Sequence, residues 1–157
     1  MFNIFMEQIV DANLNEVFEF FENPENLGVI TPDWMKFEIL TPRPLIMKKD
    51  AEFDYRINLF SVPLKWKTII TDYDPPYKFV DVQKNGPYKY WHHTHLFETE
   101  GDKTKITDNI DYKLYGGPIG VLINNIYVRK NLKSIFDFRE NKINQLFNTK
   151  GVQNDTI

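Results

Sequence analysis

The sequence has no cysteine and only 7 glycines among its 157 residues. The lack of cysteine excludes a disulfide-stabilised scaffold and any chemistry that depends on a thiolate. No glycine-rich phosphate-binding loop is present, and no window approaches the roughly 18 uncharged apolar residues of a membrane-spanning helix. The net charge is −3, with basic and acidic residues interspersed, so a nucleic-acid-binding surface is not expected. We predict a cytoplasmic protein without a membrane span.

Aromatic residues are abundant, with 13 Phe, 8 Tyr and 3 Trp. They supply large apolar areas, so the fold has either a bulky core or a cavity lined with rings. The length suits one ordinary domain. We therefore predict a single domain over residues 1–149. The polar residues 150–157 have no periodicity and are predicted to form a flexible tail.

The pattern of apolar residues predicts the order of elements. Residues 2–10 are expected to form a strand, and residues 13–27 two short helices, with Asn13 as a cap and Pro24 between them. From 52 to 114 apolar and polar residues alternate between turns, which is typical of antiparallel hairpins. After Pro118, apolar residues recur at helical spacing to about Asn148, which predicts one long helix.

This order predicts an α+β fold in which a twisted antiparallel sheet wraps around the long C-terminal helix. Each element then buries one face against the other. If the helix does not fill the groove of the sheet, a cavity remains between them.

Two stretches carry a longer pattern, "PPYKFVDVQKNGPYKYWHHTHLF" and "TKITDNIDYKLYGGPIG". Together with the order of elements, they resemble the SRPBCC superfamily (START, polyketide cyclase and pollen-allergen-like proteins), which has the helix-grip fold. They are similar to one bacterial branch with the pattern F-x-D-x-Q, G-P-Y/F, W-x-H-x-H-x-F, D-x-V-x-Y and P-x-G, and Ile110 replaces the usual valine. The matching positions are Phe79, Asp81, Gln83, Gly86, Pro87, Tyr88, Trp91, His93, His95, Phe97, Asp108, Ile110, Tyr112, Pro118 and Gly120.

The resemblance implies binding of a small molecule without a cofactor or a metal ion. Proteins of this branch are mostly described as ligand-binding or cyclase/dehydrase-like. A similar domain also occurs fused to a short-chain dehydrogenase of the nucleotide-sugar epimerase type, which suggests a separate dehydrogenase as a partner. The fold alone does not choose among these functions.

All three histidines of the chain lie between positions 92 and 95. Side chains alternate across a strand, so His93 and His95 share a face with Trp91 and Phe97, and His92 points the other way. The apolar neighbours indicate that the face of His93 and His95 is the inner one.

The expected hairpins bring two carboxylates to this face. A turn near residues 101–102 sets His95 opposite Asp108, and a turn at 85–88 sets His93 near Asp81. A buried carboxylate needs a partner, so we predict two carboxylate–imidazole pairs on the concave face.

Three interpretations of this cluster stay open. It could be a polar network that fixes strand register, or a polar patch that orients the head of an apolar ligand. It could also be a catalytic or metal site, with His93, His95, Asp81 and Asp108 as candidates. The H-x-H spacing is weak evidence for zinc, so we predict no metal ion.

The leading prediction is non-covalent binding of a lipid, a polyketide-like molecule or an isoprenoid in the cavity. The alternatives are a cyclase or dehydratase with His93 or His95 as general base, and an interaction module for a separate dehydrogenase. The predicted ligand-facing residues are Tyr55, Trp66, Phe79, Asp81, Gln83, Trp91, His93, His95, Phe97, Asp108 and Tyr112.

Overall fold

The computed structural model describes residues 1–59 and 61–148 of the chain. The predicted flexible tail, residues 150–157, and the predicted end of the domain at residue 149 lie outside the described residues. None of the described helices is long and apolar enough to cross a membrane.

The elements follow the predicted order along the chain. They are β1 (Phe2–Val10), α1 (Leu14–Glu22), the 3-10 turns η1 (Pro24–Gly28) and η2 (Asp33–Met35), β2 (Glu38–Ile39), β3 (Glu52–Leu59), β4 (Val62–Asp74), β5 (Lys78–Asn85), β6 (Tyr90–Glu100), β7 (Lys103–Lys113), α2 (Gly117–Ile123), the π-helical turn η3 (Asn124–Val128) and α3 (Arg129–Phe147).

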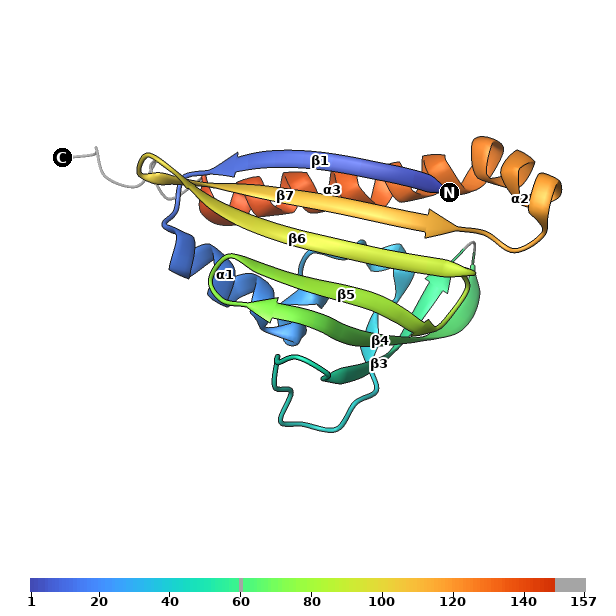
Figure 1. The fold of residues 1–157 in the computed structure, drawn as a ribbon, viewed down its shortest axis with the longest axis horizontal. Helices are drawn as coiled ribbons and strands as arrows, with labels where there is room; N and C mark the ends of the chain where they lie inside the picture. Colours follow the sequence, from blue (N-terminus) through green and yellow to red (C-terminus); the bar gives the residue numbers. More distant parts are fainter. Residues whose placement is uncertain (60, 149–157) are drawn as a thin grey trace.

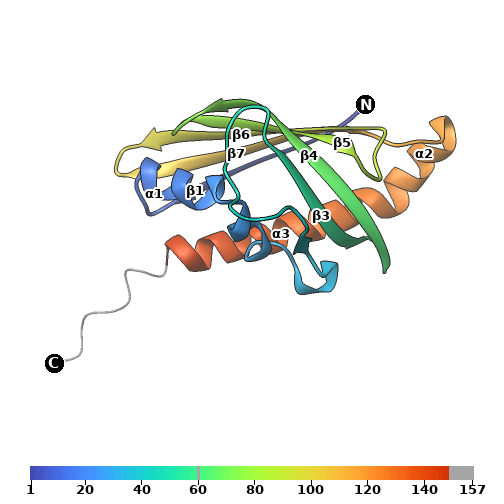
Figure 2. The same ribbon diagram turned by 90° about the horizontal axis from the view of Figure 1, so that it is seen from below.

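The strands form one antiparallel sheet in the order β1-β7-β6-β5-β4-β3-β2 (Figure 1). The C-terminal helix runs below this sheet, as Figure 2 shows. The predicted α+β architecture, a helix-grip arrangement with short helices after the first strand, is confirmed. The predicted N-cap is also present, since Asn13 Oδ1 accepts a hydrogen bond of 3.0 Å from the backbone N–H of Glu16.

The hairpin of β6 and β7 has the predicted register. Phe97 lies opposite Ile106 and His95 opposite Asp108. The turn between these strands includes Gly101 at a φ of +66°, a conformation that glycine adopts without steric cost. This register puts the apolar residues of both strands on the face that packs toward the helices.

The C-terminal helix is continuous from residue 117 to 147, which confirms the prediction of one long helix, but it is not regular. The five residues Asn124–Val128 form a π-helical turn. Asn124 is almost fully buried there, and its Oδ1 accepts a 2.8 Å hydrogen bond from the hydroxyl of Tyr112 on β7.

The first part of this helix does not pack on the sheet as predicted. In α2 only Gly120 is buried, whereas Ile119 and Leu122 are exposed. Figure 1 shows α2 extending beyond the end of the sheet. Packing on the concave face therefore begins at Asn124 and continues through α3.

Aromatic side chains fill the end of the groove below α1. Phe18 and Phe21 on this helix pack against Phe97 on β6, with ring centroids 5.3 Å and 5.2 Å apart. Ile143 and Phe147 of α3 belong to the same buried cluster. This cluster of packed side chains fills one end of the groove, so a cavity can form only in the middle of the groove.

Candidate functional site

A cavity of about 180 Å³ lies between the inner face of the sheet and the C-terminal helix. Strands β3 to β6 supply one wall, α3 supplies the other, and residues around η1 and η2 border it. Most lining side chains are aliphatic or aromatic, including Ile57, Leu59, Trp66, Leu132 and Ile135. The prediction that the helix leaves part of the groove unfilled is confirmed.

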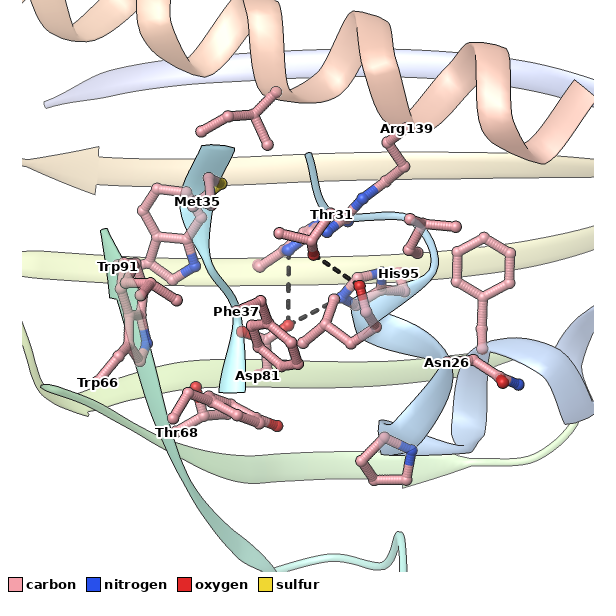
Figure 3. Close-up of a pocket in the computed structure, with 18 of the residues that line it drawn as sticks. Asn26, Thr31, Met35, Phe37, Trp66, Thr68, Asp81, Trp91, His95 and Arg139 are labelled. Atoms are coloured by element: carbon pink, nitrogen blue, oxygen red, sulfur yellow. Dashed lines mark hydrogen bonds and ion pairs between the residues drawn. The ribbon is translucent and has the colours of Figure 1, made fainter. Parts of the chain in front are cut away.

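Two polar residues of the lining are satisfied by nearby backbone. Asn26 Nδ2 donates to the carbonyl of Phe20 at 2.9 Å, and the hydroxyl of Thr31 donates to the carbonyl of Leu27 at 2.6 Å. The polar groups that remain for recognition are concentrated on one side of the cavity, where side chains of β5, β6 and α3 meet, and we call this side the polar wall. These are chiefly Asp81, His93, His95 and Arg139 (Figure 3).

Two short hydrogen bonds join the histidines to the carboxylates. Nε2 of His93 lies 2.8 Å from Oδ1 of Asp108, and Nε2 of His95 lies 2.8 Å from Oδ2 of Asp81. An ionised carboxylate only accepts hydrogen bonds, so both Nε2 atoms carry a proton.

The Nδ1 atoms face the other carboxylate of each pair. Nδ1 of His93 is 3.5 Å from Asp81 Oδ2. Nδ1 of His95 is 3.0 Å from Asp108 Oδ1. This distance allows an electrostatic contact, but the two atoms are not aligned for a hydrogen bond. The predicted pairs are thus present as contacts, while the shorter bonds run to the diagonal neighbours.

Aromatic rings cover the two imidazoles. The rings of His93 and His95 have centroids 3.7 Å apart, and Phe79 stacks on His95 at 4.1 Å. Trp91 meets His93 edge-on at 6.3 Å. These contacts, together with the bonds to the carboxylates, fix the orientation of both imidazoles.

The environment separates the pKa values of the two histidines. Burial and the neighbouring His95 lower the pKa of His93, despite its bond to Asp108. Burial also acts to lower the pKa of His95, but Asp108 and Asp81 outweigh it and raise that pKa. His95 is therefore the imidazole that holds a positive charge more readily, and His93 favours the neutral form.

Both carboxylates remain ionised despite their burial. Burial acts to raise the pKa of Asp108, but its hydrogen bond with His93 and the close imidazole of His95 hold it well below its usual range. The pKa of Asp81 is also lowered, because His95 and His93 outweigh burial. The cluster thus combines two ionised carboxylates with one imidazole that holds a charge readily, His95, and one that favours the neutral form, His93.

Arg139, on α3, is a further charged residue of this wall that the sequence analysis did not single out. Its side chain is only 9% exposed and lines the cavity, and its guanidinium carbon lies 5.0 Å from the centre of the Phe136 ring. Burial lowers the pKa of Arg139, although Asp108 and Asp81 oppose this, and arginine stays charged in proteins.

The structure places most of the predicted ligand-facing residues in the lining. These are Tyr55, Trp66, Phe79, Asp81, Trp91, His93 and His95. The other four belong to the same face of the sheet but lie away from this cavity. They are Gln83, Phe97, Asp108 and Tyr112. Whether any of them binds a ligand stays a prediction.

Each of these four has a local reason for its place. Gln83 is bonded to the backbone of Tyr88 through both ends of its amide. Phe97 lies under α1, and Tyr112 is bonded to Asn124. Asp108 lies behind His93, which it orients. The alternation of side chains along a strand predicts which face of the sheet a residue occupies. It does not predict whether other side chains cover that residue.

The alternation predicted for the three histidines is confirmed. His93 and His95 are 4% and 5% exposed and line the cavity, whereas His92 is only partly buried and stacks on the ring of Tyr90 at 6.3 Å. His92 therefore belongs to the outer face of the sheet.

Three side chains of the site have the geometry to share a metal ion. One ligand atom each from Asp81, His93 and His95 falls within 4.8 Å of the others. Two imidazoles and a carboxylate form a set that binds zinc or iron. Here, however, both Nε2 atoms already donate to carboxylates.

No protein-family model and no curated protein matches the chain, but solved structures do. A protein of Thermus thermophilus is 15% identical at a TM-score of 0.67, with 92% of this chain and 98% of that chain covered. The structure of Ara h 8.0201 is 12% identical at a TM-score of 0.61, with 92% and 98% covered. These likenesses show that the helix-grip fold is shared.

A third similar structure is part of a longer chain. It is the nucleoside-diphosphate sugar epimerase of Corynebacterium glutamicum, 18% identical at a TM-score of 0.65 over 90% of this chain. The match covers 28% of that epimerase. At this identity it too shows the fold alone.

Proposed function

We propose that the protein binds a small, largely apolar molecule in the cavity between the sheet and the C-terminal helix. The observation that carries this proposal is the lining: aliphatic and aromatic side chains surround the space, and a few polar groups converge from one wall. That composition is typical of small-molecule sites. The shared helix-grip fold agrees with a ligand-binding type of protein.

The size of the cavity limits the ligand. A volume of about 180 Å³ corresponds to roughly 12–18 water-sized positions, at about 10–15 Å³ for each. A molecule of about a dozen non-hydrogen atoms would fill it, such as a medium-length lipid chain, a small polyketide-like ring system or a short isoprenoid. A cytoplasmic location stays a prediction.

Native mass spectrometry of protein purified without added ligand tests the proposal. We expect a bound small molecule, and we expect Ile135→Phe to lower its occupancy because Ile135 lines the cavity on α3. Ile119→Phe adds the same volume on the exposed helix α2 and should leave occupancy unchanged. Equal occupancy in both variants would place the ligand elsewhere, and no retained or added apolar ligand would reject the proposal.

A second candidate function is an enzyme of the cyclase or dehydratase type. It is favoured by one observation: Asp108 accepts the Nε2 proton of His93, and the pKa of His93 is lowered. A neutral imidazole held in this tautomer offers Nδ1 as a proton acceptor. His93 is a better candidate base than His95, because its pKa is lowered whereas that of His95 is raised, and its Nδ1 lies farther from a carboxylate, at 3.5 Å against 3.0 Å.

The mass of the bound ligand separates binding from catalysis. A dehydratase would release one water, so ligand recovered from the wild-type protein would be lighter by one water than ligand recovered from His93→Gln. Identical masses reject a dehydration. A cyclisation that conserves mass would instead change the chromatographic retention of the ligand, so identical mass and identical retention favour the binding function. The third alternative, an interaction module for a separate dehydrogenase, rests on the sequence resemblance alone.

A further inference from the structure

Arg139 is a buried charge without a hydrogen-bond or ion-pair partner in the part of the chain that the structure describes. Its Nε atom is buried and makes no hydrogen bond there, and its guanidinium forms no ion pair there. Only 9% of its surface is exposed. A buried polar group normally has a hydrogen-bond partner, so this one needs an explanation.

The direction of the side chain supplies a second observation. Figure 3 shows Arg139 extending from α3 toward the side chains that the strands contribute to the cavity. Phe136, one turn earlier on α3, packs against the guanidinium. The guanidinium therefore lies at the boundary between the polar wall and the apolar interior.

The carboxylates of the site are already engaged by other residues. Asp81 has His95 at 2.8 Å, and Asp108 has His93 at 2.8 Å and His95 at 3.0 Å. Asp81 and Asp108 act on the guanidinium only through longer-range attraction. The hydrogen-bonding capacity of Arg139 is thus left for a molecule in the cavity.

We propose that Arg139 binds the carboxylate of an amphipathic ligand whose apolar part fills the cavity. This inference rests on the proposed ligand-binding function and specifies the ligand class as a medium-chain monocarboxylic acid. A guanidinium presents a planar set of donors that matches a carboxylate in a bidentate manner. The ligand is then held by one charged contact at its head and by apolar burial along its chain.

The charges nearby favour a monoanion over a phosphate ester. Asp81 lines the cavity beside Arg139 and Asp108 lies behind His93. A doubly charged head would meet the repulsion of both carboxylates, which the single charge of Arg139 does not offset. A neutral alcohol has one oxygen and no charge, so it can form neither the ion pair nor the bidentate contact that a carboxylate forms with a guanidinium. A carboxylate carries one negative charge and two oxygens, so it avoids the stronger repulsion of a phosphate ester and still forms an ion pair with Arg139.

The apolar chain of the ligand would lie against the apolar part of the cavity lining. The lining opposite the polar wall includes Ile57, Leu59 and Trp66 on the strands and Leu132 on α3. Decanoic acid has about a dozen non-hydrogen atoms, which is the capacity inferred from the cavity volume. It is therefore a suitable probe, with decanol as the neutral analogue of the same chain.

Titration calorimetry with these two probes tests the inference. The wild-type protein should bind decanoate at least about tenfold more tightly than decanol. Arg139→Met replaces the charge by an apolar side chain and should abolish this preference while decanol still binds. Arg129→Met, at an exposed position of the same helix, should keep the wild-type preference.

Each result decides one question. If the wild-type protein binds both probes equally, Arg139 does not select a carboxylate, although the cavity still binds apolar molecules. If it binds neither, the proposed function itself fails. If Arg139 serves only as a counter-charge for Asp81 and Asp108, Arg139→Met loses stability and the wild-type ratio of affinities stays near one. Equal binding of the two probes by the wild-type protein rejects the inference even if a variant does not fold.

Discussion

Nε2 of His93 bonds to Asp108 at 2.8 Å, although in the strand register Asp108 stands opposite His95. The other pair crosses in the same way, since Asp81 stands opposite His93 but bonds to His95. Side chains directly opposite each other have Cβ atoms only about 5 Å apart. Nδ1, near the backbone, therefore faces the opposite carboxylate, and the more distant Nε2 reaches the diagonal one.

This crossing joins four side chains from β5, β6 and β7 into one closed set. Each carboxylate contacts both imidazoles, and each imidazole contacts both carboxylates. Loss of one member removes one of the two contacts of each of its partners and leaves the charges of the buried site unbalanced. The set is therefore expected to act as a unit in stability as well as in ligand recognition.

Asp108→Ala is predicted to destabilise the protein strongly. Removal of one partner from a buried charged pair costs on the order of 3–5 kcal/mol, out of a total stability of roughly 5–15 kcal/mol. Urea unfolding at neutral pH, followed by circular dichroism, measures the change. His92→Ala is the matched control on the other face of the same strand and should change the free energy of unfolding by less than about 0.5 kcal/mol. Equal losses in the two variants would show that burial of the cluster does not contribute.

The stability is predicted to fall in acid. The pKa values of Asp81 and Asp108 are lowered by folding, so their contribution is present above their ordinary pKa of about 3.9 and is lost as the pH falls through the lower folded values. The lowered pKa of His93 acts in the same direction. Below about pH 6.5 the unfolded chain takes up its proton first, which favours unfolding.

The raised pKa of His95 has the opposite effect on the pH dependence of stability. Its contribution is complete below the ordinary pKa of about 6.5 and is lost as the pH rises through the folded value. Unfolding free energies measured from about pH 2 to about pH 9 should therefore have a maximum near neutrality. His95→Gln should remove the loss on the alkaline side. An unchanged alkaline slope in this variant would assign that slope to another group.

The sequence predicted the fold and the polar cluster because both depend on short-range patterns. Alternation along β6 gave the inner face of His93 and His95, and the hairpin at Gly101 fixed the partners of β7. The diagonal bonds could not be predicted, because they depend on the reach of each side chain across a twisted sheet. The positions of Phe97 and Tyr112 away from the cavity could not be predicted either. Both residues lie on the inner face of the sheet, but other elements cover them.

Arg139 was missed because its neighbours in sequence are charged. Asp137 and Glu140 suggest a solvated segment, and both are exposed. A signal was nevertheless present, since Leu132, Ile135, Phe136, Arg139 and Ile143 follow the spacing of one helical face. An arginine within an apolar stripe indicates a buried charge, but only the position of α3 over the sheet shows that it lines a cavity.

Tyr112→Phe is predicted to weaken the attachment of the helix to the sheet. The hydroxyl of Tyr112 is the donor to Asn124 in the π-helical turn, and Asn124 is only 1% exposed. An unsatisfied buried polar group costs about 1–3 kcal/mol. Tyr115→Phe removes the same hydroxyl from a side chain that is 63% exposed and should have little effect. Thermal unfolding of both variants gives the comparison, and equal melting temperatures would mean that this bond does not anchor the helix.

The last prediction concerns metal. Asp81, His93 and His95 are close enough to share an ion, yet we expect none to be bound tightly. Zinc would lie about 2.0–2.1 Å from an imidazole nitrogen. At Nε2 it would have to displace a proton and a hydrogen bond to a carboxylate, and the charge of Arg139 on the same wall opposes a second cation. Elemental analysis after dialysis should therefore find far less than one equivalent of zinc. One equivalent that is lost in His93→Gln but kept in His92→Gln would show that the cluster is a metal centre, and the catalytic alternative would then take precedence over simple binding.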